Sequence, residues 1–161
     1  MIEEVSSLNE LKKEYEKLSD KYNLPEFSKL NEIFDIEEID IDTEFLLRKI
    51  RRTISDKTTN YLRFIEIILN PSNAPMFFFR LINKLEDNDK TELGKAYELL
   101  GNLEIEIISL DLEYNEEKES EFIKRVYNIF VNQIKGILLD IVKKLSNGEN
   151  KKKNRESSYC G

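Results

Sequence analysis

Apolar side chains recur every three or four residues over most of the chain, and the longest such segment is residues 42–70. This spacing places them on one face of a helix with 3.6 residues per turn. Asp42 is a suitable N-cap, because its side-chain oxygen can accept a hydrogen bond from the first turn. Pro71 ends the segment, because proline has no N–H for a further turn. The pattern predicts one long helix against which the other elements pack. Its inward positions are Leu47, Ile50, Ile54, Tyr61, Phe64 and Ile68.

The same spacing predicts further helices before and after this one. Residues 3–22 and 120–146 form long amphipathic segments, and residues 25–34 and 75–85 form two short ones. Another long helix begins at Asp89, which with Glu92 resembles a capping box. We expect residues 35–42 to be an extended connector and residues 113–119 an acidic turn.

The segment after Asp89 needs a decision between helix and strand. Residues 103–107 alternate apolar and acidic side chains as a strand does, but the window 93–114 keeps the helical spacing, and the longer pattern decides. Gly94 and Gly101 weaken a helix interior, so we expect them where another helix approaches closely or the helix bends. Ile105, Ile108 and Leu112 widen the apolar face, which predicts burial on more than one side.

The predicted fold is therefore all-α, a single-domain helical bundle of three to four long helices plus two short ones. We expect the bundle to cover residues 1–148. Residues 149–161 have no apolar periodicity and read as a disordered basic C-terminal tail.

Composition argues against an enzyme. The chain has no histidine, which removes the commonest general base and the commonest metal ligand. Its one cysteine, Cys160, lies on the tail, and no glycine-rich phosphate loop is present. The carboxylates of residues 111–119 lack the central glycine and terminal glutamate of a calcium loop. We expect no catalytic residues, no cofactor and no metal site.

The unpaired cysteine and the short apolar runs indicate a cytoplasmic protein without a membrane-spanning segment. Its net charge is −7, and an acidic body repels phosphate at long range, which disfavours general nucleic-acid binding.

Two basic groups form the candidate contacts for an anion or RNA. Arg48, Arg51 and Arg52 are expected on the outer side of the long helix, and the tail carries the second group, Lys151, Lys152 and Lys153. For the arginines, ion pairing within the chain is the favoured alternative, with Glu44 four residues before Arg48.

An apolar run at the start of the second short helix is the candidate partner interface. Four successive large side chains on a helix point in directions that a single core face cannot bury. Central insertion of this helix among the long ones is favoured, and the alternative is that one aromatic ring is exposed as an anchor for a partner or a second copy. The run and its neighbour are Met76, Phe77, Phe78, Phe79 and Arg80.

Three stretches carry a resemblance to a known group of proteins. Residues 24–27, 30–37 and 45–52 resemble a family of small archaeal all-helical proteins of unknown function. This resemblance implies an archaeal cytoplasmic origin and adds no site residues.

Two functional hypotheses follow from these observations. The leading one is a non-enzymatic protein-interaction or assembly module with a protein partner or a homodimer. The alternative is an RNA-associated or ribosome-associated protein that uses the patch from Arg48 to Arg52 and the basic tail.

Overall fold

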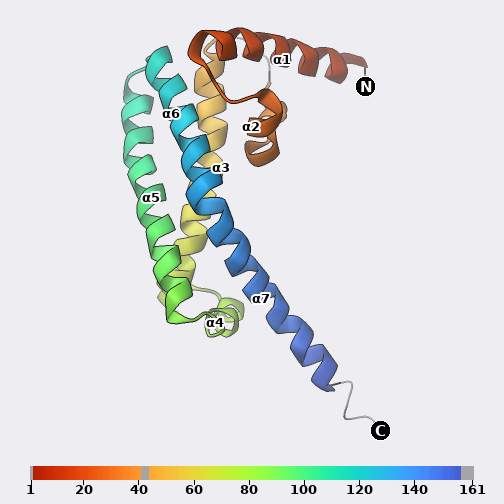
Figure 1. Ribbon diagram of the computed structural model, residues 1–161, viewed down its shortest axis with the longest axis vertical. Helices are drawn as coiled ribbons and strands as arrows, with labels where there is room; N and C mark the ends of the chain where they lie inside the picture. The colour runs from red at the N-terminus through yellow and green to blue at the C-terminus, as the bar shows by residue number, and fades with distance from the viewer. Residues whose placement is uncertain (1, 41–43, 157–161) are drawn as a thin grey trace. The chain divides into compact units, whose positions relative to one another are not determined.

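The computed structural model describes residues 2–40 and 44–156, with only the backbone described for residues 2–6, 73 and 148–156 (Figure 1). All regular structure in these ranges is helical, and residues 103–107 lie inside a helix. The all-α prediction is therefore confirmed. The helices are α1 (Ile2–Tyr22), α2 (Phe27–Phe34), α3 (Leu46–Leu69), α4 (Met76–Ile82), α5 (Asp87–Leu112), α6 (Glu116–Ile129) and α7 (Lys135–Glu156). Three short elements join them: the 3-10 turns η1 (Ile36–Glu38) and η2 (Pro71–Asn73) and the π-helical η3 (Phe130–Ile134), which links α6 to α7.

The chain divides into two compact units. Unit 1 is Met1–Asn60 with Asn102–Ile129, and unit 2 is Tyr61–Gly101 with Phe130–Gly161. The helix predicted to end at Ser146 is described to Glu156. Residues 157–161 lie outside the described residues, and the disorder expected for 149–161 stays a prediction.

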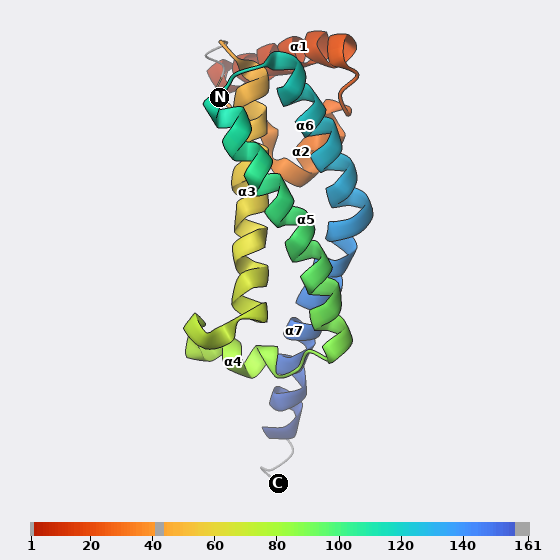
Figure 2. The same ribbon diagram turned by 90° about the vertical axis from the view of Figure 1, so that its left-hand side faces the viewer.

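In unit 1, α1 lies across the N-terminal end of α3 (Figure 2). The apolar faces of α1, α2, α3, α5 and α6 form the core of this unit, as the helical spacing predicts. Tyr15 of α1 packs edge-on against Phe27 of α2, with ring centroids 5.4 Å apart. The buried side chains include Leu11, Tyr15, Leu30, Phe34, Leu47, Ile50, Ile54, Leu103, Leu110, Phe122, Ile123 and Val126.

In unit 2, α4 packs against α7 (Figure 2). The ring of Tyr61 lies 5.3 Å from that of Phe130, centroid to centroid. The core of this unit consists of aliphatic side chains with one aromatic ring. Its members include Ile65, Ile68, Ile82, Leu93, Leu100, Phe130, Ile134, Leu138, Ile141 and Leu145.

Two helix starts differ from the prediction. The backbone N–H of Glu86 donates to Asp89 Oδ2 at 3.0 Å, so Glu86 precedes the helix and Asp89 lies inside its first turn. Asp89 is therefore the third residue of the helix, and its carboxylate accepts a hydrogen bond from the backbone N–H of the residue before the helix. It is not the N-cap residue itself. The backbone N–H of Lys118 donates to Asn115 Oδ1 at 2.9 Å, which starts α6 at Glu116 rather than Ser120.

The acidic residues expected in a turn thus extend into α6. Glu116, Glu117 and Glu119 lie in its first turn, where negative charge complements the positive end of the helix dipole. The predicted cap Asp42 lies outside the described residues, and α3 begins at Leu46.

The prediction that α5 is buried on more than one side is wrong, and so is one of the two alternatives for its glycines. A Cβ atom built on Gly94 or Gly101 meets no heavy atom within 4 Å, so neither glycine marks a close helix approach. The other alternative, a bend of the helix at these glycines, stays a prediction. Ile105, Ile108 and Leu112 are 70%, 60% and 84% exposed, so they do not add a second buried side. The apolar face that α5 buries in unit 1 runs through Leu103, Ile107 and Leu110 only.

Candidate functional site

The arginines of α3 form ion pairs inside unit 1 instead of an outward patch. Arg51 Nε lies 2.7 Å from Glu119 Oε2, and Arg51 Nη2 lies 2.7 Å from Asp111 Oδ1. The side chains of Arg51 and Glu119 are buried. The prediction that all three arginines lie on the outer side of the helix is therefore wrong for Arg51. Ion pairing, the favoured alternative, is present, but with residues of α5 and α6 instead of Glu44.

Arg48 is held by backbone carbonyls at the end of α5. Its Nη2 donates to the carbonyl oxygens of Leu110 at 3.0 Å and Asp111 at 2.9 Å. Its guanidinium carbon lies 5.4 Å from the ring centroid of Tyr114. A cation at this position complements the negative end of the helix dipole, so Arg48 stabilises the end of α5.

The charges of this cluster affect the titration of Asp111. Partial burial would raise the pKa of this carboxyl, but the hydrogen bond from Arg51 and the charges of Arg51, Arg52 and Arg48 outweigh it. The pKa of Asp111 therefore lies below its ordinary value, and the carboxylate is ionised at neutral pH.

Of the three arginines, Arg52 is the most exposed, and its Nε lies 3.6 Å from Asp111 Oδ1. The guanidinium groups of Arg48 and Arg51 point at oxygen atoms of unit 1, so they offer little hydrogen-bonding capacity to an external phosphate. The side chains of Lys151, Lys152 and Lys153 lie outside the described side chains. The expected RNA contact through them remains a prediction.

The sequence contains a signal for the burial of Arg51 and Glu119 that the prediction missed. Arg51 follows Leu47 by four residues and precedes Ile54 by three, so it shares their inward face. Glu119 precedes Phe122 by three residues and Ile123 by four on α6, so it shares their inward face. A charged residue at an inward position needs an opposite charge inside the fold.

The apolar run of α4 is mostly on the surface of unit 2. Met76, Phe77 and Phe79 are 88%, 59% and 42% exposed, whereas Phe78 is half-buried and Ile82 is buried. The favoured prediction of central insertion is therefore wrong, and the alternative of an exposed aromatic anchor fits. The reason is that α4 has only seven residues and uses one side to contact its own unit.

The segment that carries this run has a positive charge. Arg80 and Lys84 are exposed, and residues 74–85 contain no Asp or Glu. Within the described part of the chain, neither cation forms an ion pair. We define the α4 face as Met76, Phe77, Phe79 and Arg80. It is an apolar surface with a cationic edge on an acidic protein.

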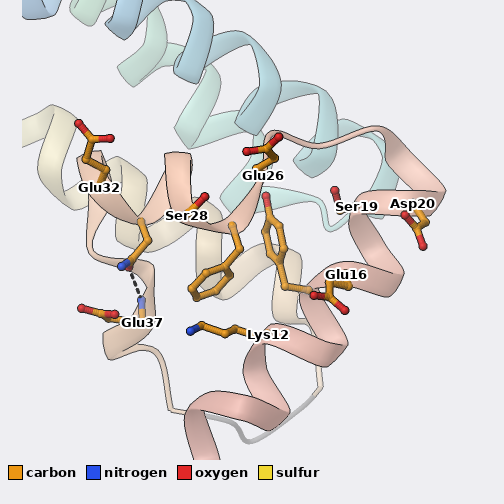
Figure 3. A pocket seen from close by; sticks show the side chains of 11 residues that line it. Lys12, Glu16, Ser19, Asp20, Glu26, Ser28, Glu32 and Glu37 are labelled. Atoms are coloured by element: carbon orange, nitrogen blue, oxygen red, sulfur yellow. Dashed lines mark hydrogen bonds between the residues drawn. The ribbon is translucent and has the colours of Figure 1, made fainter.

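A groove of about 780 Å³ lies between α1 and α2 in unit 1 (Figure 3). Lys12 Nζ lies 5.6 Å from the ring centroid of Phe27, which already provides a cation for this aromatic face. The groove is lined by five carboxylate side chains, so its charge suits a cationic group. They are Glu16, Asp20, Glu26, Glu32 and Glu37. Sequence spacing did not reveal this groove, because its carboxylates come from two helices and a connector.

Tyr15 also lines this groove, and its phenol is not placed to act as a general base. Its hydroxyl donates to the carbonyl oxygen of Pro25, and burial raises the pKa of its phenol. The phenol is therefore neutral at physiological pH and serves to join α1 to the start of α2.

The described residues contain no cluster of three or more Cys, Asp or Glu side chains placed to hold a metal ion. No helix in the described ranges is both long enough and apolar enough to cross a bilayer. Comparisons with models of protein families, with curated proteins and with solved structures find no match to this chain. The resemblance to small archaeal helical proteins remains an expectation from the sequence.

Proposed function

We propose that this chain is a non-enzymatic protein-interaction module and that the α4 face is its docking surface. The observation that supports this proposal is the exposure of Met76, Phe77 and Phe79 on one short helix. A group of large apolar side chains that lie next to one another on a protein surface often marks an interaction site. Aromatic side chains also supply a large share of binding energy at protein interfaces.

The chemistry of the α4 face defines the partner. Full burial of a Met or Phe side chain contributes about 1.5–3 kcal/mol relative to full exposure, and these three are exposed in part. Arg80 and Lys84 add positive charge without a nearby acid in the segment. The partner is therefore a protein with an apolar surface and acidic side chains at its edge.

The RNA-associated alternative has weaker support. Arg48 and Arg51 are engaged by carbonyl and carboxylate oxygens of their own unit. A phosphate would have to compete with these contacts, and the negative charge of the protein opposes its approach.

The test is purification of partners from an extract of the source organism, followed by reconstitution from pure proteins. The bait proteins are the wild type, Met76→Glu/Phe77→Glu on α4, and the matched control Leu139→Glu/Val142→Glu, which alters two exposed residues of α7. We expect a partner that binds the wild type and the control with a defined stoichiometry and has lost affinity for the α4 variant.

The salt dependence of that binding separates the two functional hypotheses. Docking through apolar side chains persists when salt is raised, whereas phosphate binding weakens steeply. A reconstituted partner that binds the α4 variant as tightly as the wild type contradicts the proposal. So does an RNA that binds the pure chain and is released by salt in the absence of any protein partner.

A further inference from the structure

We infer that the partner of the α4 face is a second copy of this chain and that it docks on the exposed apolar residues of α5. This inference rests on the proposed function, since it names the partner of the same surface. We define the α5 stripe as Ile105, Ile108 and Leu112. The contact is heterologous, with α4 of one copy against α5 of the next.

The α5 stripe has the form of a helix-docking site. Its three residues follow the i, i+3, i+7 spacing, which places them in one row on the helix surface. All three side chains are exposed, although the row is as apolar as the buried face of the same helix. An amphipathic helix that docks on such a row covers it with its own apolar anchors.

The α5 stripe and the whole of helix α4 are similar in length, although the α4 face, from Met76 to Arg80, covers only about 6 Å of it. The α5 stripe extends over about 10 Å, from the helical rise of 1.5 Å per residue over its seven-residue span. With seven residues, α4 has nearly the same length. Each surface offers three large apolar side chains, so the two can cover each other without leaving a long apolar overhang.

The charges of the two surfaces are complementary. Residues 102–113 contain four carboxylates and no Lys or Arg, whereas residues 74–85 contain Arg80 and Lys84 and no Asp or Glu. On a helix with 100° per residue, Glu104 and Asp111 flank one side of the α5 stripe, and Glu106 flanks the other. Glu113 follows directly after the last residue of the helix, Leu112.

Some of the acidic charge at the α5 stripe is already neutralised. Asp111 is paired with Arg51, and Glu106 is paired with Arg125 of α6. Glu104 accepts a hydrogen bond from the Thr59 hydroxyl, which leaves its charge in place. Glu104 beside the row and Glu113 directly after the end of α5 therefore provide most of the remaining negative charge.

Charge also disfavours the two symmetric alternatives. Pairing of two α5 stripes would place carboxylates against carboxylates, and pairing of two α4 faces would bring Arg80 and Lys84 of both copies together. Of these three pairings, the one that places α4 of one copy on α5 of another brings opposite charges together. A heterologous contact of this kind leaves one free surface at each end, so it builds a ring or an open assembly.

The test is a mixing experiment between two blocked variants. Met76→Glu/Phe77→Glu blocks the α4 face, and Ile105→Glu/Ile108→Glu blocks the α5 stripe. All four positions are exposed, so both variants should fold, which circular dichroism and thermal melting check. Sedimentation velocity then measures each variant alone, their equimolar mixture, the wild type and the α7 control over a range of concentrations.

We expect the wild type and the α7 control to associate progressively with concentration and each blocked variant to stay monomeric. The mixture should form a one-to-one dimer and nothing larger, because each chain keeps only one functional surface. Charge reversal tests the charged residues beside the two surfaces. Arg80→Glu/Lys84→Glu on the α4 side should weaken association with an unchanged α5 stripe. Glu104→Lys/Glu113→Lys in the chain that supplies the α5 stripe should restore it.

A wild type that is monomeric at all concentrations overturns this inference. A blocked variant that associates by itself does the same, because it shows a symmetric contact. If a different protein binds the α4 face while the wild type stays monomeric, the proposed function holds and only the identity of the partner is wrong. If the α4 variant loses no partner and no self-association, both fail.

Discussion

Arg51 Nε of α3 and Glu119 Oε2 of α6 lie 2.7 Å apart, and both side chains are almost completely removed from solvent, at 1% and 0% exposure. Asp111 of α5 binds the same guanidinium. These contacts join three helices of unit 1 through residues that are 60 and 68 positions apart in the sequence. A buried charge is tolerated because its partner is buried with it.

Removal of one member of this pair should strongly destabilise the protein. Arg51→Met removes the nearer cation of the buried Glu119 carboxylate and leaves it only Arg48, whose Nε lies 3.8 Å from Glu119 Oε1. Loss of one partner of a buried ion pair typically reduces the free energy of unfolding by about 3–5 kcal/mol. Urea denaturation of the variant and the wild type measures this difference. A loss below about 1 kcal/mol would show that water reaches Glu119.

The double variant Arg51→Met/Glu119→Leu is the matched control. It replaces both charges by apolar groups, and such replacements are often neutral or stabilising relative to the ion pair. We expect it to be more stable than Arg51→Met alone. If the two variants are equally unstable, the loss comes from packing and not from an unpaired charge.

The helices of this fold could be predicted because their apolar spacing is local. The partners of Arg51 could not, since periodicity identifies the inward face of one helix but not the residue opposite it. The inward position of Arg51 was nevertheless visible between Leu47 and Ile54. The exposure of Phe77 and Ile105 could not be predicted for a different reason. An apolar side chain is expected to be buried, but the sequence does not show whether another part of the same unit covers it, and here none does.

The ion pair between Asp89 and Lys144 in unit 2 should make stability depend on pH at both extremes. The hydrogen bond from Lys144 and the one from the Glu86 N–H lower the pKa of Asp89, and the hydrogen bond to Asp89 raises the pKa of Lys144. A lowered carboxyl pKa gives stability that is present above the unfolded value of about 3.9 and is lost as pH falls through the folded value. A raised amine pKa gives stability that is present below about 10.4 and is lost as pH rises through the folded value.

Asp89→Asn should therefore flatten the stability profile below about pH 4 and above about pH 10, because the amide keeps an oxygen for the Glu86 N–H but carries no charge. Thermal melting across this pH range provides the measurement. Some acid dependence should remain from Asp111, whose pKa is also lowered. A profile identical to that of the wild type would mean that the pair does not persist in solution.

Gly101→Ala should stabilise the protein. Gly101 lies in the interior of α5, and a Cβ atom built there meets no heavy atom within 4 Å. Alanine is favoured over glycine in a helix interior by about 1 kcal/mol, so the free energy of unfolding should rise by up to that amount. Gly94→Ala is a second site with the same open surroundings and should behave alike. Destabilisation by both changes would indicate a close neighbour.

Single alanine variants of α4 should separate its exposed and buried residues. Phe77→Ala removes an exposed ring and should change the free energy of unfolding by no more than about 0.5 kcal/mol. Ile82→Ala removes a buried side chain and should reduce it by about 2–5 kcal/mol. Melting temperatures of the two variants give the comparison. Equal, large losses for both would place Phe77 in the core.

The docking role of the α4 face is tested most directly by photo-crosslinking through a benzophenone amino acid placed at Phe77. The same amino acid at Leu139, an exposed position of α7, is the control. We predict a discrete protein adduct through position 77 and none through position 139, with mass spectrometry showing whether the captured chain is a second copy or another protein. No adduct through position 77, or the same adduct through both positions, would contradict the proposal that α4 is a specific docking surface.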